Sequence, residues 1–296
     1  MKILLFGSTG LLGSHLLREF GNRGWEICAP RRNDVNLFDL SRVNNFVGPW
    51  LARHPDGVVV YAAGYTEIAK CDLNPGTAEH LNVVVPFLLA NLCSRVNGRF
   101  VYFSSDQVFM DDRTSSFYQH HEGDDLDGVF RTTQVYGRTK ADAETFLRRY
   151  SRSMIIRTSW LFGDHPTRQN FVRDVVTQAV AGNLITALTD YVACPCYAPD
   201  VAYAAGELIE DPTAEGTYHA VNGPPVSRLE MTRAILEAAG LAGRVEACRQ
   251  SDMENWILRN PNGGLKNNRG PQLRPWTNAL RQYLSSMPEL SVSITA

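Results

Sequence analysis

The sequence predicts an α/β protein with a doubly wound parallel sheet and a smaller, interleaved C-terminal domain. In the first half, short continuous apolar runs alternate with helical patterns, which is typical of parallel strands covered on both faces. The runs lie at 2–6, 27–29, 58–63, 100–103 and 154–156, and the helical patterns at 41–53, 78–96 and 139–150. After about residue 160, proline and glycine separate shorter elements, so a second structural unit is expected there.

Composition excludes several classes of protein. The 296 residues, with 44% hydrophobic and 20% charged side chains, allow a full core in one large or two modest domains. The net charge of -2 gives no support for nucleic-acid binding, and no apolar run approaches the roughly 20 residues that span a membrane. The six cysteines include no C-x-x-C pair, so we expect free thiols in a cytoplasmic protein and no zinc site.

The clearest motif follows the first apolar run. Residues 7–13 read Gly-Ser-Thr-Gly-Leu-Leu-Gly and lead directly into a helical pattern. Gly7 would permit the tight turn, Gly10 the approach of a pyrophosphate, and Gly13 close packing of helix on strand. The helix N-terminus would then hold the phosphates of a dinucleotide. The cofactor-binding residues predicted here are Gly7, Ser8, Thr9, Gly10, Leu11, Leu12 and Gly13; a glycine-rich turn of some other α/β protein is the alternative.

This motif gives the predicted domains their roles. We assign residues 1–163 to a dinucleotide-binding domain, with a segment near 185–210 that returns to it. Residues 164–296 are assigned mainly to substrate binding. A helix is expected at 226–241, and the Asn-, Gly- and Pro-rich stretch at 260–275 is expected to be a loop.

The end of the second strand indicates which dinucleotide binds. An acidic residue there would bind the ribose 2′-hydroxyl of NAD, but this chain has Arg31 and Arg32, which suit a 2′-phosphate. NADPH is therefore favoured and NADH is left open, because the arginines could be solvated and Asp34 could be the acid. The small residues Ala62, Ala63 and Gly64, at the end of the apolar run 58–63, would let the cofactor lie flat against the end of that strand.

Two further motifs predict the chemistry. Ser104, Ser105 and Asp106 end a buried strand, and Tyr136 and Lys140 follow in a Tyr-x-x-x-Lys pattern. On a helix these two residues share a face, so the Lys140 ammonium is expected to lower the phenol pKa of Tyr136. Such a tyrosine can exchange a proton with a carbonyl or carbinol oxygen.

Together these motifs resemble the extended short-chain dehydrogenase/reductase family with its Rossmann-type sheet, and within it the dTDP-4-dehydrorhamnose reductases. The resemblance rests on residues 7–13, 62–66, 104–109, 136–140 and 156–163, with 169–171 and 274–275 in support. It implies reduction by NADPH of the 4-keto group of a nucleotide-linked 6-deoxyhexose. Tyr136 would protonate the oxyanion, Ser105 would hydrogen-bond it, and Lys140 would hold the nicotinamide ribose.

The resemblance also implies further contacts. Asn36, Tyr65 and Ser104, with Tyr136 and Lys140, would touch the cofactor. The substrate contacts would be Ser105, Asp106, Gln107, Tyr136, Trp160 and Asn170. For Trp160, composition alone favours a place in the core.

Some residues depart from the family pattern. Gln107 replaces the glutamate of nucleotide-sugar dehydratases and the tyrosine of the reductases. An amide cannot shuttle a proton, so reduction is favoured over dehydration, while the sugar stays open. Cys194-Pro195-Cys196 also differs from the reductase pattern.

The alternative function is a non-catalytic NADP-binding regulator similar to the beta subunit of methionine adenosyltransferase. The sequence allows a homodimer and leaves the oligomeric state open.

One acidic and histidine-rich segment could be taken for a metal site. His120, His121 and Glu122 are followed by three aspartates up to residue 127. A solvated loop is the more common outcome, because geometry and not density selects a metal. We predict no metal, and the resemblance implies a lid near the substrate.

Overall fold

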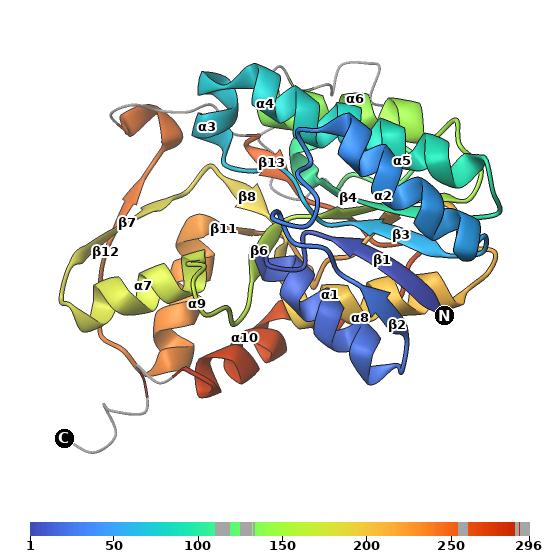
Figure 1. Cartoon of the computed structure of the whole chain (residues 1–296). Helices are drawn as coiled ribbons and strands as arrows, with labels where there is room; N and C mark the ends of the chain where they lie inside the picture. Colours follow the sequence, from blue (N-terminus) through green and yellow to red (C-terminus); the bar gives the residue numbers. More distant parts are fainter. Residues whose placement is uncertain (110–118, 125–131, 133, 254–259, 288–289, 291–296) are drawn as a thin grey trace.

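The computed structural model describes residues 1–109, 119–124, 132, 134–253, 260–287 and 290. Its centre is a six-stranded, wholly parallel sheet in the order β10-β5-β4-β3-β1-β2 (Figure 1). The strands are β1 Lys2–Phe6, β2 Glu26–Cys28, β3 Val58–Tyr61, β4 Arg99–Ser105, β5 Ser153–Thr158 and β10 Gly216–His219. The predicted doubly wound parallel sheet is confirmed.

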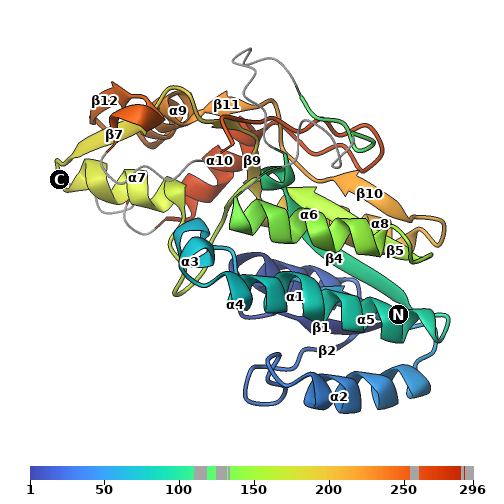
Figure 2. The ribbon, with the colours of Figure 1, turned by 90° about the horizontal axis from the view of Figure 1, so that it is seen from above.

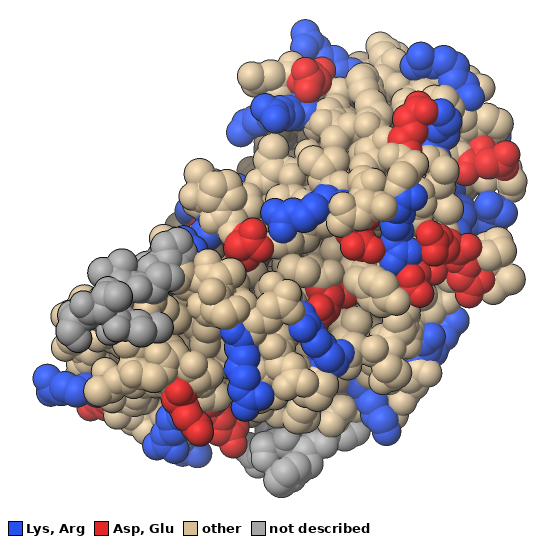
Figure 3. All heavy atoms as spheres, turned by 90° about the horizontal axis from the view of Figure 1, so that it is seen from below, with Lys and Arg blue, Asp and Glu red and all other residues tan. Residues whose placement is uncertain are grey.

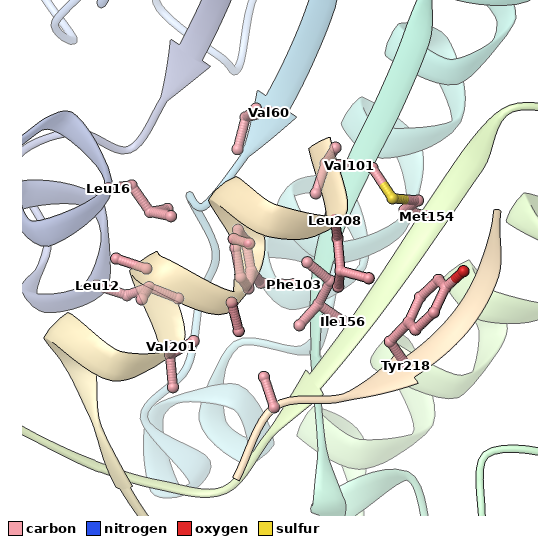
Figure 4. Packing of buried hydrophobic residues seen from close by; sticks show 14 of the residues in the cluster. Leu12, Leu16, Val60, Val101, Phe103, Met154, Ile156, Val201, Leu208 and Tyr218 are labelled. Carbon is pink, nitrogen blue, oxygen red and sulfur yellow. The ribbon is translucent and has the colours of Figure 1, made fainter. Parts of the chain in front are cut away.

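Helices cover both faces of this sheet, which is why its strands are apolar throughout. Helices α1 (Leu11–Asn22) and α8 (Ala198–Glu210) lie on one face, and α2 (Leu40–Arg53), α5 (Val85–Ser94) and α6 (Val135–Leu147) on the other (Figure 1). In β1, Ile3 and Leu5 belong to one buried cluster and Leu4 and Phe6 to the other. Figure 4 shows part of the first cluster, to which α1 contributes Leu12 and Leu16, α8 contributes Val201 and β3 contributes Val60.

The second unit lies beyond one end of the sheet and has its own core (Figure 2). Its strands form small sheets: β7 (Leu184–Leu188) with β12 (Arg244–Cys248), β6 (Trp160–Phe162) with β9 (Pro195–Tyr197), and β8 (Val192–Ala193) between β11 (Val226–Ser227) and β13 (Asn262–Gly263). Its helices are α7 Phe171–Val180, α9 Arg228–Ala239 and α10 Trp276–Ser285. Helix α9 begins at a capping box of Ser227 and Glu230 and ends at left-handed Gly240, which stops it before the predicted end at 241.

Several predicted boundaries differ from the observed ones. The helix expected at 78–96 is divided into α4 (Pro75–Glu79), a π-helical turn (His80–Val84) and α5, after a short α3 (Ile68–Leu73). Helix α6 begins at Val135, earlier than expected. The stretch at 260–275 contains β13. Short 3₁₀ turns occupy Asp106–Val108 and Gln250–Asp252.

The predicted domain division can be compared with these elements. Within the returning segment predicted near 185–210, α8 packs against α1, whereas β7 pairs with β12 outside the main sheet. Strand β10, at 216–219, joins the main sheet beyond the predicted segment. The return to the sheet domain thus runs through α8 and β10, and the exact domain boundaries stay a prediction.

Charges of both signs are interspersed on the face seen in Figure 3. At the C-terminal end of α1, the Arg23 guanidinium lies 2.8 Å from both Glu19 and Glu207 and 2.9 Å from Glu210. Over the described residues, no helix is long and apolar enough to span a bilayer.

Candidate active site

The glycine turn between β1 and α1 has three distinct glycines. Gly7 has φ +86°, and a Cβ there would come within 2.5 Å of the Ala63 nitrogen. A Cβ on Gly13 would overlap the Gly7 carbonyl. The backbone of the protein therefore requires glycine at both positions, whether or not a ligand binds. A Cβ on Gly10 would meet only the Gly7 oxygen at 3.4 Å. Packing therefore tolerates a side chain at Gly10, and the open space at the N-terminus of α1 fits a phosphate group.

A first cavity of about 200 Å³ lies beside this turn. Its lining includes Ser8 and Thr9 from the turn and Arg31, Arg32 and Asn36 from the segment after β2. Both arginines are exposed. The Asp34 carboxylate accepts a hydrogen bond of 2.8 Å from the Arg31 backbone N–H and closes that turn. The arginines are thus the charged groups available to a ribose 2′-substituent here, which fits NADPH.

A second cavity, of about 530 Å³, extends from the glycine turn to α6. Predicted residues in its lining are Gly7, Thr9, Gly10, Leu11, Leu12, Ala62, Ala63, Gly64, Ser104, Tyr136 and Lys140. Gly13 and Tyr65 do not line either cavity; the Tyr65 backbone bonds to the Asn82 side chain instead. The lining also contains residues that were not among the predicted site residues: Thr66, Phe103, Thr158, Leu161, Arg168 and Gln169. Thr66, Thr158, Leu161 and Gln169 lie in stretches that carry the family resemblance, whereas no sequence pattern marks Arg168 as a ligand contact.

Tyr136 and Lys140 lie on consecutive turns of α6 and line the same cavity, as their spacing predicted. The Lys140 Nζ donates a 2.9 Å hydrogen bond to the Phe103 carbonyl and lies 4.5 Å from the Tyr102 ring centre. Burial lowers the pKa of Lys140 to about 7.

The predicted effect of Lys140 on Tyr136 is wrong for this structure. Burial raises the pKa of the Tyr136 phenol above its usual value, and a hydrogen bond with Ser105 opposes that rise only in part. The reason is desolvation, which disfavours the phenolate, while Lys140 is itself buried and tends to lose its proton. Tyr136 is therefore protonated at neutral pH, which is the form that donates a proton.

Ser105 ends β4 and caps the buried 3₁₀ turn Asp106–Val108, beside Tyr136. The Ser105 hydroxyl donates 2.9 Å to one Asp106 oxygen, and the Gln107 amide donates 2.9 Å to the other. Burial raises the pKa of Asp106 to about 6, against these hydrogen bonds. Ser105 thus lies between the phenol and a carboxylate, and contacts of Asp106 and Gln107 with a sugar stay predictions.

Trp160 and Asn170 have clear structural roles. The Trp160 ring packs on Tyr191 at 4.9 Å between ring centres, and the Arg228 guanidinium lies 3.6 Å from its centre. The Asn170 amide group donates to the Gly163 carbonyl and the Tyr283 hydroxyl, while its oxygen caps α7. Asn170 thus has its polar atoms engaged within the protein, and its substrate contact stays an unsupported prediction.

The histidine-rich segment is described only in part, since 110–118, 125–131 and 133 lie outside the described residues. His120 stacks on Phe109 with ring centres 3.9 Å apart, and the Glu122 carboxylate accepts backbone N–H groups of Asn268 and Arg269. Among described residues, no group of three His, Cys, Asp or Glu could hold a metal. The predicted lid stays a prediction.

All six cysteines are free, as predicted. Cys194 and Cys196 are buried, and the Cys194 thiol lies 3.4 Å from the Leu265 carbonyl. The Cys-Pro-Cys departure therefore forms part of the packing between β8, β9 and the segment after β13.

Comparison with known proteins places this geometry in a family. The chain is 29% identical over 288 residues to the spore coat polysaccharide biosynthesis protein SpsK of Bacillus subtilis, covering 96% of each chain. It is 27% identical to a dTDP-4-dehydrorhamnose reductase of Mycolicibacterium smegmatis, covering 97% of this chain and 86% of that protein. Methionine adenosyltransferase 2 subunit beta of Xenopus tropicalis is 28% identical, with 81% of this chain and 72% of that protein covered.

Solved structures agree with the fold. A dTDP-4-dehydrorhamnose reductase of Bacillus anthracis, solved in complex with NADP, superimposes with a TM-score of 0.86 at 21% identity, over 97% of this chain and 99% of that one. The family described as "RmlD substrate binding domain" matches residues 1–288. The resemblance predicted from the motifs is thus confirmed, and the chain belongs to the RmlD substrate-binding domain family.

Proposed function

We propose that this protein uses NADPH to reduce the 4-keto group of a nucleotide-linked 6-deoxyhexose, with dTDP-4-dehydrorhamnose or a close relative as the substrate. The observation that carries the proposal is the position of Tyr136, Lys140 and Ser104 at one end of the same cavity that begins at the glycine turn. Similarity to the Mycolicibacterium smegmatis reductase supports the substrate class.

The residues present fit this cofactor. The open N-terminus of α1 suits its diphosphate, and Arg31 and Arg32 suit its 2′-phosphate. When bound, NADPH supplies the hydride. Lys140, whose Nζ is fixed on the Phe103 carbonyl, would hold the nicotinamide ribose.

The chain's own residues would handle the proton. The Tyr136 phenol, kept protonated by burial, donates its proton to the oxygen that becomes the new hydroxyl. Ser105 hydrogen-bonds with Tyr136 and orients the phenol toward that oxygen. Gln107 lies one residue beyond Asp106 and offers an amide, so the turn lacks the second carboxylate that elimination of water would use.

The regulator alternative is weaker. It is supported by the similarity to methionine adenosyltransferase 2 subunit beta. Tyr136 and Lys140 line the cavity, and Ser105 hydrogen-bonds with Tyr136. These retained residues favour an enzyme, because a regulator needs no positioned proton donor. We also propose a cytoplasmic location, which the six free cysteines support. The homodimer stays a prediction.

The test is oxidation of NADPH with dTDP-4-dehydrorhamnose and a panel of related 4-keto sugars. Tyr136→Phe is expected to lower kcat by about 100-fold or more, because the proton donor is lost, while NADPH still binds. Tyr203→Phe, at an exposed tyrosine of α8, is the control and should keep full activity. Turnover with none of the sugars, or unchanged kcat in Tyr136→Phe, would contradict the proposal.

A further inference from the structure

The loop between β6 and α7 is tied to the glycine turn and α1. His165 Nδ1 accepts the backbone N–H groups of Thr167 and Arg168, at 3.1 and 2.9 Å. Because Nδ1 is the acceptor, Nε2 carries the proton and donates to the Thr9 carbonyl at 3.2 Å. One residue earlier, the Asp164 carbonyl lies 3.0 Å from Nε2 of His15, a buried residue of α1. The loop is therefore held at two points beside the phosphate-binding end of α1.

This anchoring presents Arg168 to the 530 Å³ cavity. Arg168 lines it together with Gly10, Leu11 and Lys140, and is exposed. Among the described lining residues, Arg168 and Lys140 carry the charged side chains. The Lys140 Nζ already bonds to the Phe103 carbonyl, deep in the cavity. Lys70 of α3 lies close enough to Arg168 for electrostatic repulsion, but it is paired with Glu67 at 2.6 Å. No ion pair of Arg168 is found among the residues that the structure describes, so its charge is available to a ligand in this cavity.

We propose that Arg168 binds the diphosphate of the dinucleotide opposite the N-terminus of α1, and that His165 is the positioning residue that holds it there. The inference rests on the proposed function, because it takes the dinucleotide as the ligand. It adds a binding residue that the glycine motif does not contain.

Charge explains why such a residue is needed. A diphosphate linkage carries two negative charges, whereas a helix N-terminus offers a partial positive charge of roughly one half. A guanidinium supplies a full charge and a planar pair of donors that matches phosphate oxygens. A nucleotide sugar also carries a diphosphate. The dinucleotide is the ligand the contacts favour, because Asp164 and His165, the loop residues that precede Arg168, bond to His15 and Thr9, at α1 and the turn. The loop's bond to the second core is made at its last residue, Asn170.

The experiment measures affinities of the full-length protein for four probes: NADPH, ADP-ribose, adenosine 2′-monophosphate and dTDP. Arg168→Gln should weaken the affinities for NADPH and ADP-ribose about tenfold, since a charged hydrogen bond to phosphate is lost. Adenosine 2′-monophosphate lacks the diphosphate and should bind with unchanged affinity. Arg42→Gln removes an exposed charge from α2, outside both cavities, and should change none of the four.

His165 is tested by a double-mutant cycle. His165→Ala should weaken ADP-ribose by a similar factor, and His165→Ala/Arg168→Gln should be no weaker than Arg168→Gln alone. A His165 that only stabilised the fold would instead act additively and would also weaken adenosine 2′-monophosphate. Thermal unfolding of each variant identifies any loss of folded protein.

The outcomes separate the two proposals. If the unmodified protein binds no NADPH, the proposed function fails. If NADPH binds and Arg168→Gln leaves its affinity unchanged, this inference is overturned. A loss of affinity for dTDP alone also overturns it, because the charge would then serve the substrate diphosphate.

Discussion

At the scale of single residues, burial of the Lys140 amine in the candidate active site lowers the stability of the fold. Its side chain is 3% exposed, and burial lowers its pKa from 10.5 to about 7. A folded pKa below the unfolded one means that the unfolded chain binds the proton more tightly, so folding costs free energy below about pH 10. This free-energy cost of burying Lys140 has its full size at and below about pH 7, and it disappears above the pKa that Lys140 has in the unfolded chain.

Lys140→Met should therefore stabilise the fold while removing activity. We expect the free energy of unfolding to rise by on the order of 2 kcal/mol at neutral pH, because an apolar chain of similar length replaces a buried amine. The gain should shrink as the pH rises from about 7 toward 10. Urea unfolding at several pH values measures it. Lys70→Met, on the exposed side of α3, is the control, and an equal gain there would contradict the argument.

Sequence could predict some of these residues and not others. The Tyr136–Lys140 pair follows from spacing on one helix, so the local pattern was sufficient. The pKa of Tyr136 depends on how much protein covers it, and that comes from distant segments, so its direction was predicted wrongly. Asn170 was similarly ambiguous, because its partners Gly163 and Tyr283 come from the start of its own loop and from α10.

At the scale of elements, the β1–α1 turn separates folding from binding. Gly13 and Gly7 approach each other so closely that a Cβ on Gly13 would overlap backbone, which cannot move aside cheaply. Gly10 has no such neighbour. The three-glycine pattern correctly predicted the tight turn at Gly7 and the close helix packing at Gly13, because both follow from the turn and the first helix. The phosphate contact at Gly10 stays a prediction. The π-helical turn at His80–Val84 was not predictable, since it places Asn82 against the Tyr65 backbone and Thr139.

Two alanine variants test this separation. Gly13→Ala should lower the free energy of unfolding by about 2 kcal/mol or more through overpacking. Gly10→Ala should lower the free energy of unfolding by less than about 1 kcal/mol, as expected at a helix N-cap. The same variant should weaken NADPH affinity at least about tenfold, because the methyl group occupies the phosphate position. Urea unfolding and NADPH titration of both variants distinguish the effects. Equal affinity losses with no stability difference would contradict the assignment.

At the scale of the whole molecule, Asn222 joins the sheet domain to the second unit. Its side-chain oxygen accepts from the Tyr197 N–H at 2.8 Å, and its amide donates to Asp200 and to the Arg274 carbonyl. Its backbone carbonyl accepts from the Trp276 N–H at the start of α10. The Arg274 side chain adds to this connection, because it donates two hydrogen bonds to the Asp200 carboxylate of α8. The sequence pointed to Arg274 by resemblance but not to Asn222, because its partners are dispersed along the chain.

Asn222→Ala should therefore destabilise the molecule more than its size suggests. The side chain is 1% exposed, and its loss leaves the buried Tyr197 N–H without its acceptor and removes a donor from Asp200. Each unsatisfied group costs roughly 1–3 kcal/mol, so we expect a loss of about 2–4 kcal/mol in urea unfolding. Asn33→Ala, at an exposed position, should stay within about 0.5 kcal/mol. Asn222→Asp keeps the acceptor but faces Asp200 with a second carboxylate, so its destabilisation should decrease toward low pH, where one carboxylate is protonated. A loss in Asn222→Ala no larger than in Asn33→Ala would show that other contacts hold the two parts together.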